Sequence, residues 1–111
     1  MPKVFNKLNW QLFSNQDRIT AIEALKAIIS KNDGYIVNFN LFSDLALSLT
    51  VEIEEQNISN LYSELETIIS ISESKPGNID DHSKKDWWIL MNVSFSKGKG
   101  NLKVEIPDVP G

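Results

Sequence analysis

The sequence predicts one small α+β domain with two helices on one face of a largely antiparallel sheet. Two observations indicate this class. The apolar periodicity switches between the repeats of strands and of helices, in the order strand, helix, strand, strand, helix, strand, strand. The chain has 111 residues, of which 41% are hydrophobic, and this suits a single domain over residues 1–111 with one hydrophobic core.

The first strand is expected over about residues 4–13, where apolar and polar side chains alternate. Ser14 or Asn15 is expected to cap a helix that runs to about Lys31. The tripeptide at 32–34, Asn-Asp-Gly, is expected to end it, because these residues tolerate a left-handed backbone. The helix is supported by an apolar stripe at three-to-four spacing: Ile19, Ile22, Leu25, Ile28 and Ile29.

Two strands are expected next, over about residues 35–41 and 45–53. The second has the clearest alternation in the chain, with Leu, Val or Ile at every second position over nine residues. In the first of them, alternation predicts that the apolar side chains face one way and that Asn38 and Asn40 face the other. The apolar set is Tyr35, Val37, Phe39 and Leu41.

A second helix is expected over about residues 58–71, with Asn57 as its cap. The stretch 72–86 is polar and contains a Pro-Gly pair at 76–77, so we expect a mobile loop there.

The last two strands are expected over about residues 87–96 and 102–106, joined by a turn at 98–100. Alternation directs Trp87 toward the core and Trp88 away from it.

One face of the predicted sheet lacks helices and is polar, mostly uncharged, and interrupted by two large apolar groups. We expect Trp88, Leu90 and Asn92 to form an interface there, because an open face of this kind suits a partner. The other residues expected on this face are Asn9, Gln11, Asn38, Asn40, Ser48, Thr50 and Ser94.

Charge and composition argue against several classes of function. The net charge is −4, so the phosphate backbone of a nucleic acid would be repelled on average. The two clusters of lysines, at 84–85 and 97–103, contain few residues, and no nucleic acid is expected as a partner. There is no cysteine, which excludes thiolate chemistry and disulfides. No window approaches the roughly 18 apolar residues of a spanning helix, and no signal-peptide core is visible. We therefore expect no membrane association and a cytoplasmic location.

No catalytic or metal motif stands out. His82 is the single histidine and follows two aspartates in the expected loop, where adjacent residues rarely converge on an ion. No nucleophile elbow and no phosphate loop is present. We expect no cofactor, no metal and no catalytic residue.

The βαββαβ order resembles the ferredoxin-like fold, with an extra C-terminal strand. Within that fold, the stretch 10–69 resembles an ACT domain. Asp17-Arg18 stand where that family's Asp-Arg-Pro-Gly turn opens the first helix, although Ile-Thr follows here, and an Asp-Gly turn at 33–34 precedes the second strand. The resemblance implies a regulatory homodimer that binds an amino acid or similar molecule. The ligand-binding positions it implies are Asn15, Asp17, Arg18, Asn38 and Asn40.

Three functions remain open at this point. The first is the ACT-like ligand-binding domain, homo-oligomeric through its sheet. The second is a protein-interaction module, such as an immunity protein or adaptor, without a small ligand. The third is an enzyme resembling the cofactor-free dimeric α+β-barrel monooxygenases, for which Asn38, Trp88 and His82 would be the candidates.

Overall fold

The structure, a computed structural model, describes residues 6–97. The predicted turn at 98–100 and the predicted strand at 102–106 lie outside the described residues. In chain order the elements are β1 (Asn6–Asp17), α1 (Arg18–Lys31), β2 (Tyr35–Ser43), β3 (Ala46–Glu54), the 3₁₀ turn η1 (Glu55–Asn57), α2 (Ile58–Leu65), β4 (Ser70–Ile71) and β5 (Asp86–Lys97).

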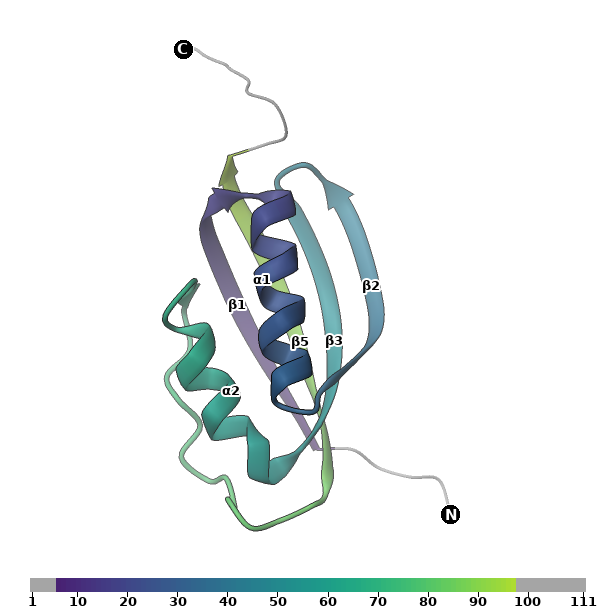
Figure 1. The fold of residues 1–111 in the computed structure, drawn as a ribbon, viewed down its shortest axis with the longest axis vertical. Coiled ribbons are helices and arrows are strands. Elements are labelled where there is room, and N and C mark those ends of the chain that lie inside the picture. Colours follow the sequence, from purple (N-terminus) through teal and green to yellow (C-terminus); the bar gives the residue numbers. More distant parts are fainter. Residues whose placement is uncertain (1–5, 98–111) are drawn as a thin grey trace.

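The described strands form one five-stranded mixed sheet in the order β2-β3-β5-β1-β4. β1 and β5 are parallel, and the other three pairings are antiparallel. Both helices lie on the same side of this sheet (Figure 1). The α+β class and its two layers are therefore confirmed. The exact ferredoxin-like topology is not confirmed and stays a prediction. In the described sheet the last strand, β5, lies between β1 and β3.

The core lies between the sheet and the helices. The alternation predicted for β3 and β5 is confirmed, since Leu47, Leu49, Val51 and Ile53 are all buried. Their counterparts on β5 are the buried Val93, Met91 and Ile89 and the partly buried Trp87. The Trp10 ring meets Tyr62 of α2 edge-on, with ring centroids 5.4 Å apart. The remaining large core side chains are Leu12, Leu25, Ile29, Ile58, Leu61, Leu65, Ile69, Ile89, Met91, Val93 and Phe95.

The start of α1 differs from the prediction. β1 continues to Asp17, and Asp17 rather than Ser14 or Asn15 is the N-cap. Its carboxylate accepts hydrogen bonds from the backbone N–H and the hydroxyl of Thr20, at 3.2 Å and 2.6 Å. Ser14 is buried and paired within the sheet, so pairing with β5 extends the strand past the expected cap.

The end of α1 is as predicted and also fastens the two helices together. Asn32 is the C-cap, and Asp33 has a positive φ of 61°. Glu64 of α2 accepts hydrogen bonds from Lys31 Nζ at 2.6 Å and from Asn32 Nδ2 at 2.7 Å. The helix end is therefore closed by its own backbone and by its neighbour.

α2 is shorter than the sequence predicts, ending at Leu65 instead of about residue 71. The chain then turns, and Ile69 N–H donates to the Leu65 carbonyl at 3.0 Å. Ser70 and Ile71 pair antiparallel with β1. Ile69, whose spacing suggested a longer helix, is still buried. It reaches the core from a turn that returns the chain to the sheet, and not from a further turn of helix.

β2 also departs from the simple alternation. Its register against β3 shifts twice, between Ile36 and Asn38 and between Leu41 and Ser43. The first shift breaks the predicted single row: Tyr35 is opposite Glu52 of the helix-free face, whereas Phe39 is opposite the buried Leu49. The extra residue of a β-bulge reverses the phase of the pleat, and this separates Tyr35 from Phe39.

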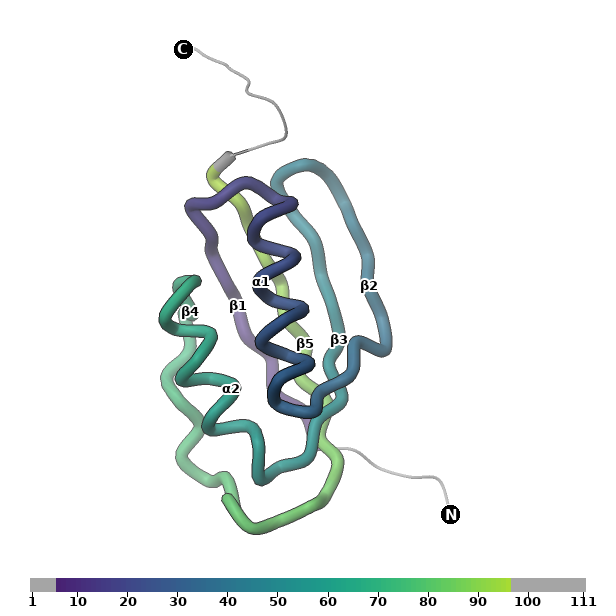
Figure 2. Tube along the Cα trace, viewed as in Figure 1, coloured from purple at the N-terminus to yellow at the C-terminus, as the bar shows by residue number. Residues whose placement is uncertain are grey.

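The connection from β4 to β5 runs back along the sheet edge and beneath α2 (Figure 2). It is tied down by several contacts. Tyr62 Oη donates to the Glu73 carbonyl at 2.6 Å, Ser72 N–H donates to the Gln11 carbonyl at 2.9 Å, and Gln56 N–H donates to the Ser83 carbonyl at 2.8 Å. Its mobility stays a prediction.

Candidate functional site

The helix-free face of the sheet, called the open face below, carries the predicted interface residues in one line. Trp88, Leu90 and Asn92 occupy alternate positions of β5, while Ile89 and Met91 between them are buried under the helices. β5 has neighbours on both sides, so these three side chains stand near the middle of the sheet. The prediction that they face away from the helices is confirmed by this register.

Two cross-strand rows join the interface residues to the predicted asparagines. One row runs from Asn38 through Thr50 and Leu90 to Asn9. The other runs from Asn40 through Ser48 and Asn92 to Gln11. Five of the eight predicted site residues therefore share the open face, namely Asn38, Asn40, Trp88, Leu90 and Asn92.

The polar groups of these rows are neutral and loosely paired. Asn9 Oδ1 accepts from Gln11 Nε2 at 3.4 Å and from Asn92 Nδ2 at 3.5 Å, both near the upper limit for a hydrogen bond. Breaking such long hydrogen bonds costs little free energy, so the amide groups of Gln11 and Asn92 can donate instead to the backbone or side chain of an approaching partner.

Charge enters the open face at one end. Trp88 Nε1 donates to Glu52 Oε1 at 3.1 Å, and Lys7 Nζ lies 5.9 Å from the centroid of the Trp88 ring. Trp88 is thus held in a fixed orientation with part of its ring accessible. At the opposite end Phe13 is opposite Ser94 and is 44% exposed, which adds a second aromatic group to this surface.

The other three predicted site residues lie at the turn between β1 and α1. Hydrogen bonds from the Thr20 hydroxyl and then from its backbone N–H lower the pKa of Asp17. Arg18 Nη1 lies 2.7 Å from Asp44 Oδ1 in the turn between β2 and β3. Asn15 is exposed. α1 is on the opposite side of the sheet from Asn38 and Asn40, so the structure does not bring the five predicted ligand residues into one place.

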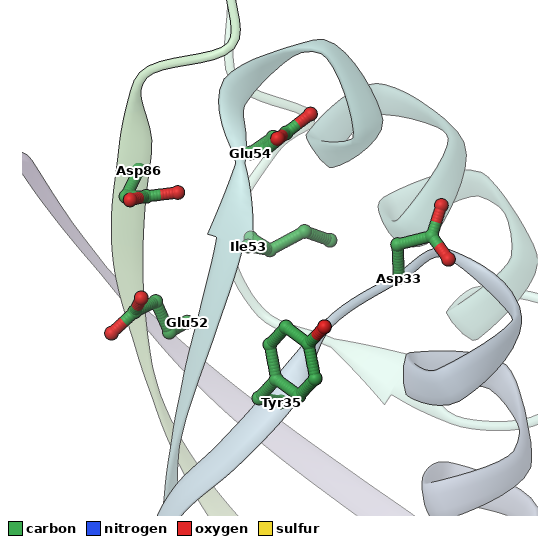
Figure 3. A pocket seen from close by; sticks show the side chains of 6 residues that line it. All are labelled: Asp33, Tyr35, Glu52, Ile53, Glu54 and Asp86. Carbon is green, nitrogen blue, oxygen red and sulfur yellow. The ribbon is translucent and has the colours of Figure 1, made fainter.

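A pocket of about 220 Å³ opens at the other end of β2, and sequence reasoning did not indicate it. Figure 3 shows its carboxylates pointing in different directions, and no group of three or more His, Cys, Asp or Glu in residues 6–97 is placed to hold a metal ion. Its residues come from separate elements, so no local motif could have revealed it. The lining is Asp33, Tyr35, Glu52, Ile53, Glu54 and Asp86.

The predicted loop contains one buried anchor that the sequence did not single out. Glu55, 7% exposed, accepts a hydrogen bond from the Asp80 backbone N–H at 2.8 Å, and this contact is the main cause of a lowered pKa at Glu55. Buried Trp87 Nε1 has no hydrogen-bond partner among the described residues, although it lies near enough to Glu55 to contribute to that shift. His82 is exposed, and its backbone N–H donates to Asp80 Oδ1 at 2.9 Å.

Neither helix in residues 6–97 combines the length and the apolar character needed to cross a bilayer. Comparisons with known proteins found no family model that matches the chain, no similar curated protein and no similar solved structure.

Proposed function

We propose that this chain is a non-catalytic protein-interaction module that binds a partner protein on its open face. The observation that carries the proposal is the placement of Trp88 and Leu90 on the middle strand of a sheet face that no helix covers. Both side chains are half-buried by their neighbours and are therefore ordered before a partner arrives.

The chemistry of the surrounding rows supports a protein as the partner. Interface centres are depleted in charge and enriched in aromatic groups, and tryptophan is prominent among the residues that dominate binding energy. Here the two central rows contain only amides, hydroxyls and Leu90. Trp88 lies in the adjoining row, where Lys7 and Glu52 are its neighbours on either side. The order of the long elements along the chain supports a ferredoxin-like scaffold. Any such description must also account for β5, which lies between β1 and β3.

The test is capture of partners by the full chain from the cells that express it, with two charge-introducing variants. Leu90→Glu places a carboxylate in the middle of the open face. Ile19→Glu makes the same change at a site on α1 that is 57% exposed. The proposal expects that the wild type and Ile19→Glu retain the same partner and that Leu90→Glu loses it. Retention by Leu90→Glu would contradict it.

The ACT-like ligand-binding role is a second candidate, supported by the helix that starts at Asp17-Arg18, where the resemblance expects it. A ligand carboxylate would have to displace Asp44 from Arg18. Thermal unfolding against amino acids, nucleotides and common metabolites tests this role, because a ligand at 100 times its dissociation constant adds about 2.7 kcal/mol. A midpoint shift that Arg18→Ala abolishes would favour the ligand, and an unchanged midpoint across the panel would remove this candidate.

A further inference from the structure

The two edges of the described sheet are built very differently. One edge is β4, a strand of two residues. The other edge is β2, a strand of nine residues whose one neighbour among the described strands is β3. A long free edge presents backbone N–H and C=O groups that can pair with another strand.

β2 and the turn that follows it expose six large apolar side chains, and this segment is called the β2 edge below. Soluble proteins usually protect such a strand with lysine, other charges or proline. The sequence Tyr35–Ser43 contains no charged residue and no proline. The exposed side chains are Tyr35 (71%), Val37 (47%), Phe39 (40%), Leu41 (48%), Phe42 (69%) and Leu45 (49%).

The middle of β2 is regular enough to act as a template. The two register shifts flank four residues, 38–41, that keep an unbroken ladder with β3. Within this stretch Phe39 and Leu41 are opposite the buried Leu49 and Leu47, on the helix side. Asn38 and Asn40 alternate with them on the open face. The central stretch therefore has one apolar face and one amide face.

We propose that β2 pairs antiparallel with β2 of a second copy of this chain, so that one sheet continues across a two-fold axis. The self-complementary pattern of the strand favours a second copy as the occupant, because antiparallel pairing places apolar against apolar and amide against amide. In an antiparallel pairing of β2 with itself no charged residue meets another, whereas like charges directly opposite each other would be destabilising. Phe39 and Leu41 of both copies then cover one another on the helix side, and the asparagines meet on the open face.

This dimer is independent of the proposed binding of a partner. Leu90 and Trp88 lie on β5, two strands from the free edge, so edge pairing leaves them accessible. Phe39→Lys and Leu90→Glu therefore separate loss of the dimer from loss of the partner, because Phe39 lies on the helix side and Leu90 on the open face.

The experiment measures the mass of the full chain in solution by light scattering over a series of concentrations. The wild type is expected at twice the 12.6 kDa of one chain. The double variant Asn38→Asp/Asn40→Asp adds charge at nearly constant shape and should raise the dimer dissociation constant by about tenfold or more, because like charges then face each other across the axis. Asn15→Asp is the matched control, since this exposed asparagine lies outside β2, and it should remain dimeric.

A second pair of variants tests the apolar face. Phe39→Lys places the usual protecting residue on the free edge and should also give a monomer, whereas Ile19→Lys should not. Circular dichroism confirms that each variant is folded.

Three results would overturn the proposal. The first is a wild-type monomer throughout the concentration series. The second is a dimer that survives both Asn38→Asp/Asn40→Asp and Phe39→Lys but dissociates in Leu90→Glu, because the interface would then be the open face. The third is a monomer whose β2 amides resist hydrogen exchange at every concentration, because the occupant would then belong to the same chain.

Discussion

Glu55 Oε2 accepts a hydrogen bond of 2.8 Å from the Asp80 backbone N–H, and this contact holds the long β4–β5 connection against the start of α2. The neighbouring backbone reinforces it, since Glu55 N–H donates to the Lys85 carbonyl at 2.8 Å. The C-terminal part of this connection, which has no regular secondary structure beyond β4, is thus held by the Glu55 carboxylate together with backbone hydrogen bonds.

Replacing this anchor should loosen the loop without unfolding the domain. Glu55→Ala removes the acceptor and leaves the Asp80 amide unpaired, so hydrogen exchange at Asp80 and its neighbours should accelerate. Glu54→Ala is the control, because the Glu54 carboxylate accepts from Gln56 and not from the loop. Equal exchange rates in the two variants would show that Glu55 does not anchor the loop.

Stability should decline in acid through three carboxylates. The pKa values of Asp17, Glu55 and Glu64 are lowered by hydrogen bonds from Thr20, from Asp80 and from Lys31 respectively. Their stabilisation is complete above the ordinary pKa, 3.8 for Asp and 4.5 for Glu, and is lost as pH falls through the lower folded values. The midpoint of thermal unfolding, followed from neutral pH to about pH 3, should fall less steeply in Glu64→Gln than in the wild type. Parallel curves would contradict a folded-state shift at Glu64.

The correct N-cap of α1 can be identified by substitution. Asp17→Ala should lower the melting temperature, because two donors of Thr20 lose their acceptor. Asp17→Ser should recover part of the loss, since a serine hydroxyl can also accept at this position. Asn15→Ala should have little effect, because Asn15 lies within β1, before the N-cap Asp17, and is exposed.

Adjacent residues of β5 should differ sharply in their contribution to folding. Ile89 is fully buried, and Ile89→Ala should cost about 2–5 kcal/mol of the free energy of unfolding. Leu90 is on the open face, and Leu90→Ala should cost distinctly less, although it makes the same kind of truncation. Urea denaturation of both variants checks the assignment of the two faces, which equal losses would refute.

The glycine after α1 should not tolerate a side chain. A Cβ at Gly34 would lie 3.0 Å from Ile29 Cγ2 and 3.2 Å from the Ile29 carbonyl oxygen. Gly34→Ala should therefore destabilise by about 1–3 kcal/mol, as overpacking does. Gly77→Ala is the control, because a Cβ there meets nothing within 4 Å, and it should leave the urea midpoint unchanged or slightly raised.

Local patterns by themselves determined the parts of the molecule whose environment is uniform along an element. β3 and the central part of β5 are covered by helices on one side only, so strict alternation translated directly into buried and outward rows, including the outward position of Trp88. The end of α1 was equally readable, because the backbone requirement there is local and Asn-Asp-Gly meets it.

The tertiary structure decided the features that depend on which segments meet. Pairing with β5 carried β1 past Ser14 to Asp17, and pairing with β1 converted the expected end of α2 into β4. The shifts in β2 are set by its fit against β3, and a period-two pattern contains no information about an inserted residue. The burial of Glu55 and the exposure of the β2 edge likewise follow from strand order and loop path, because both depend on neighbours distant in the chain.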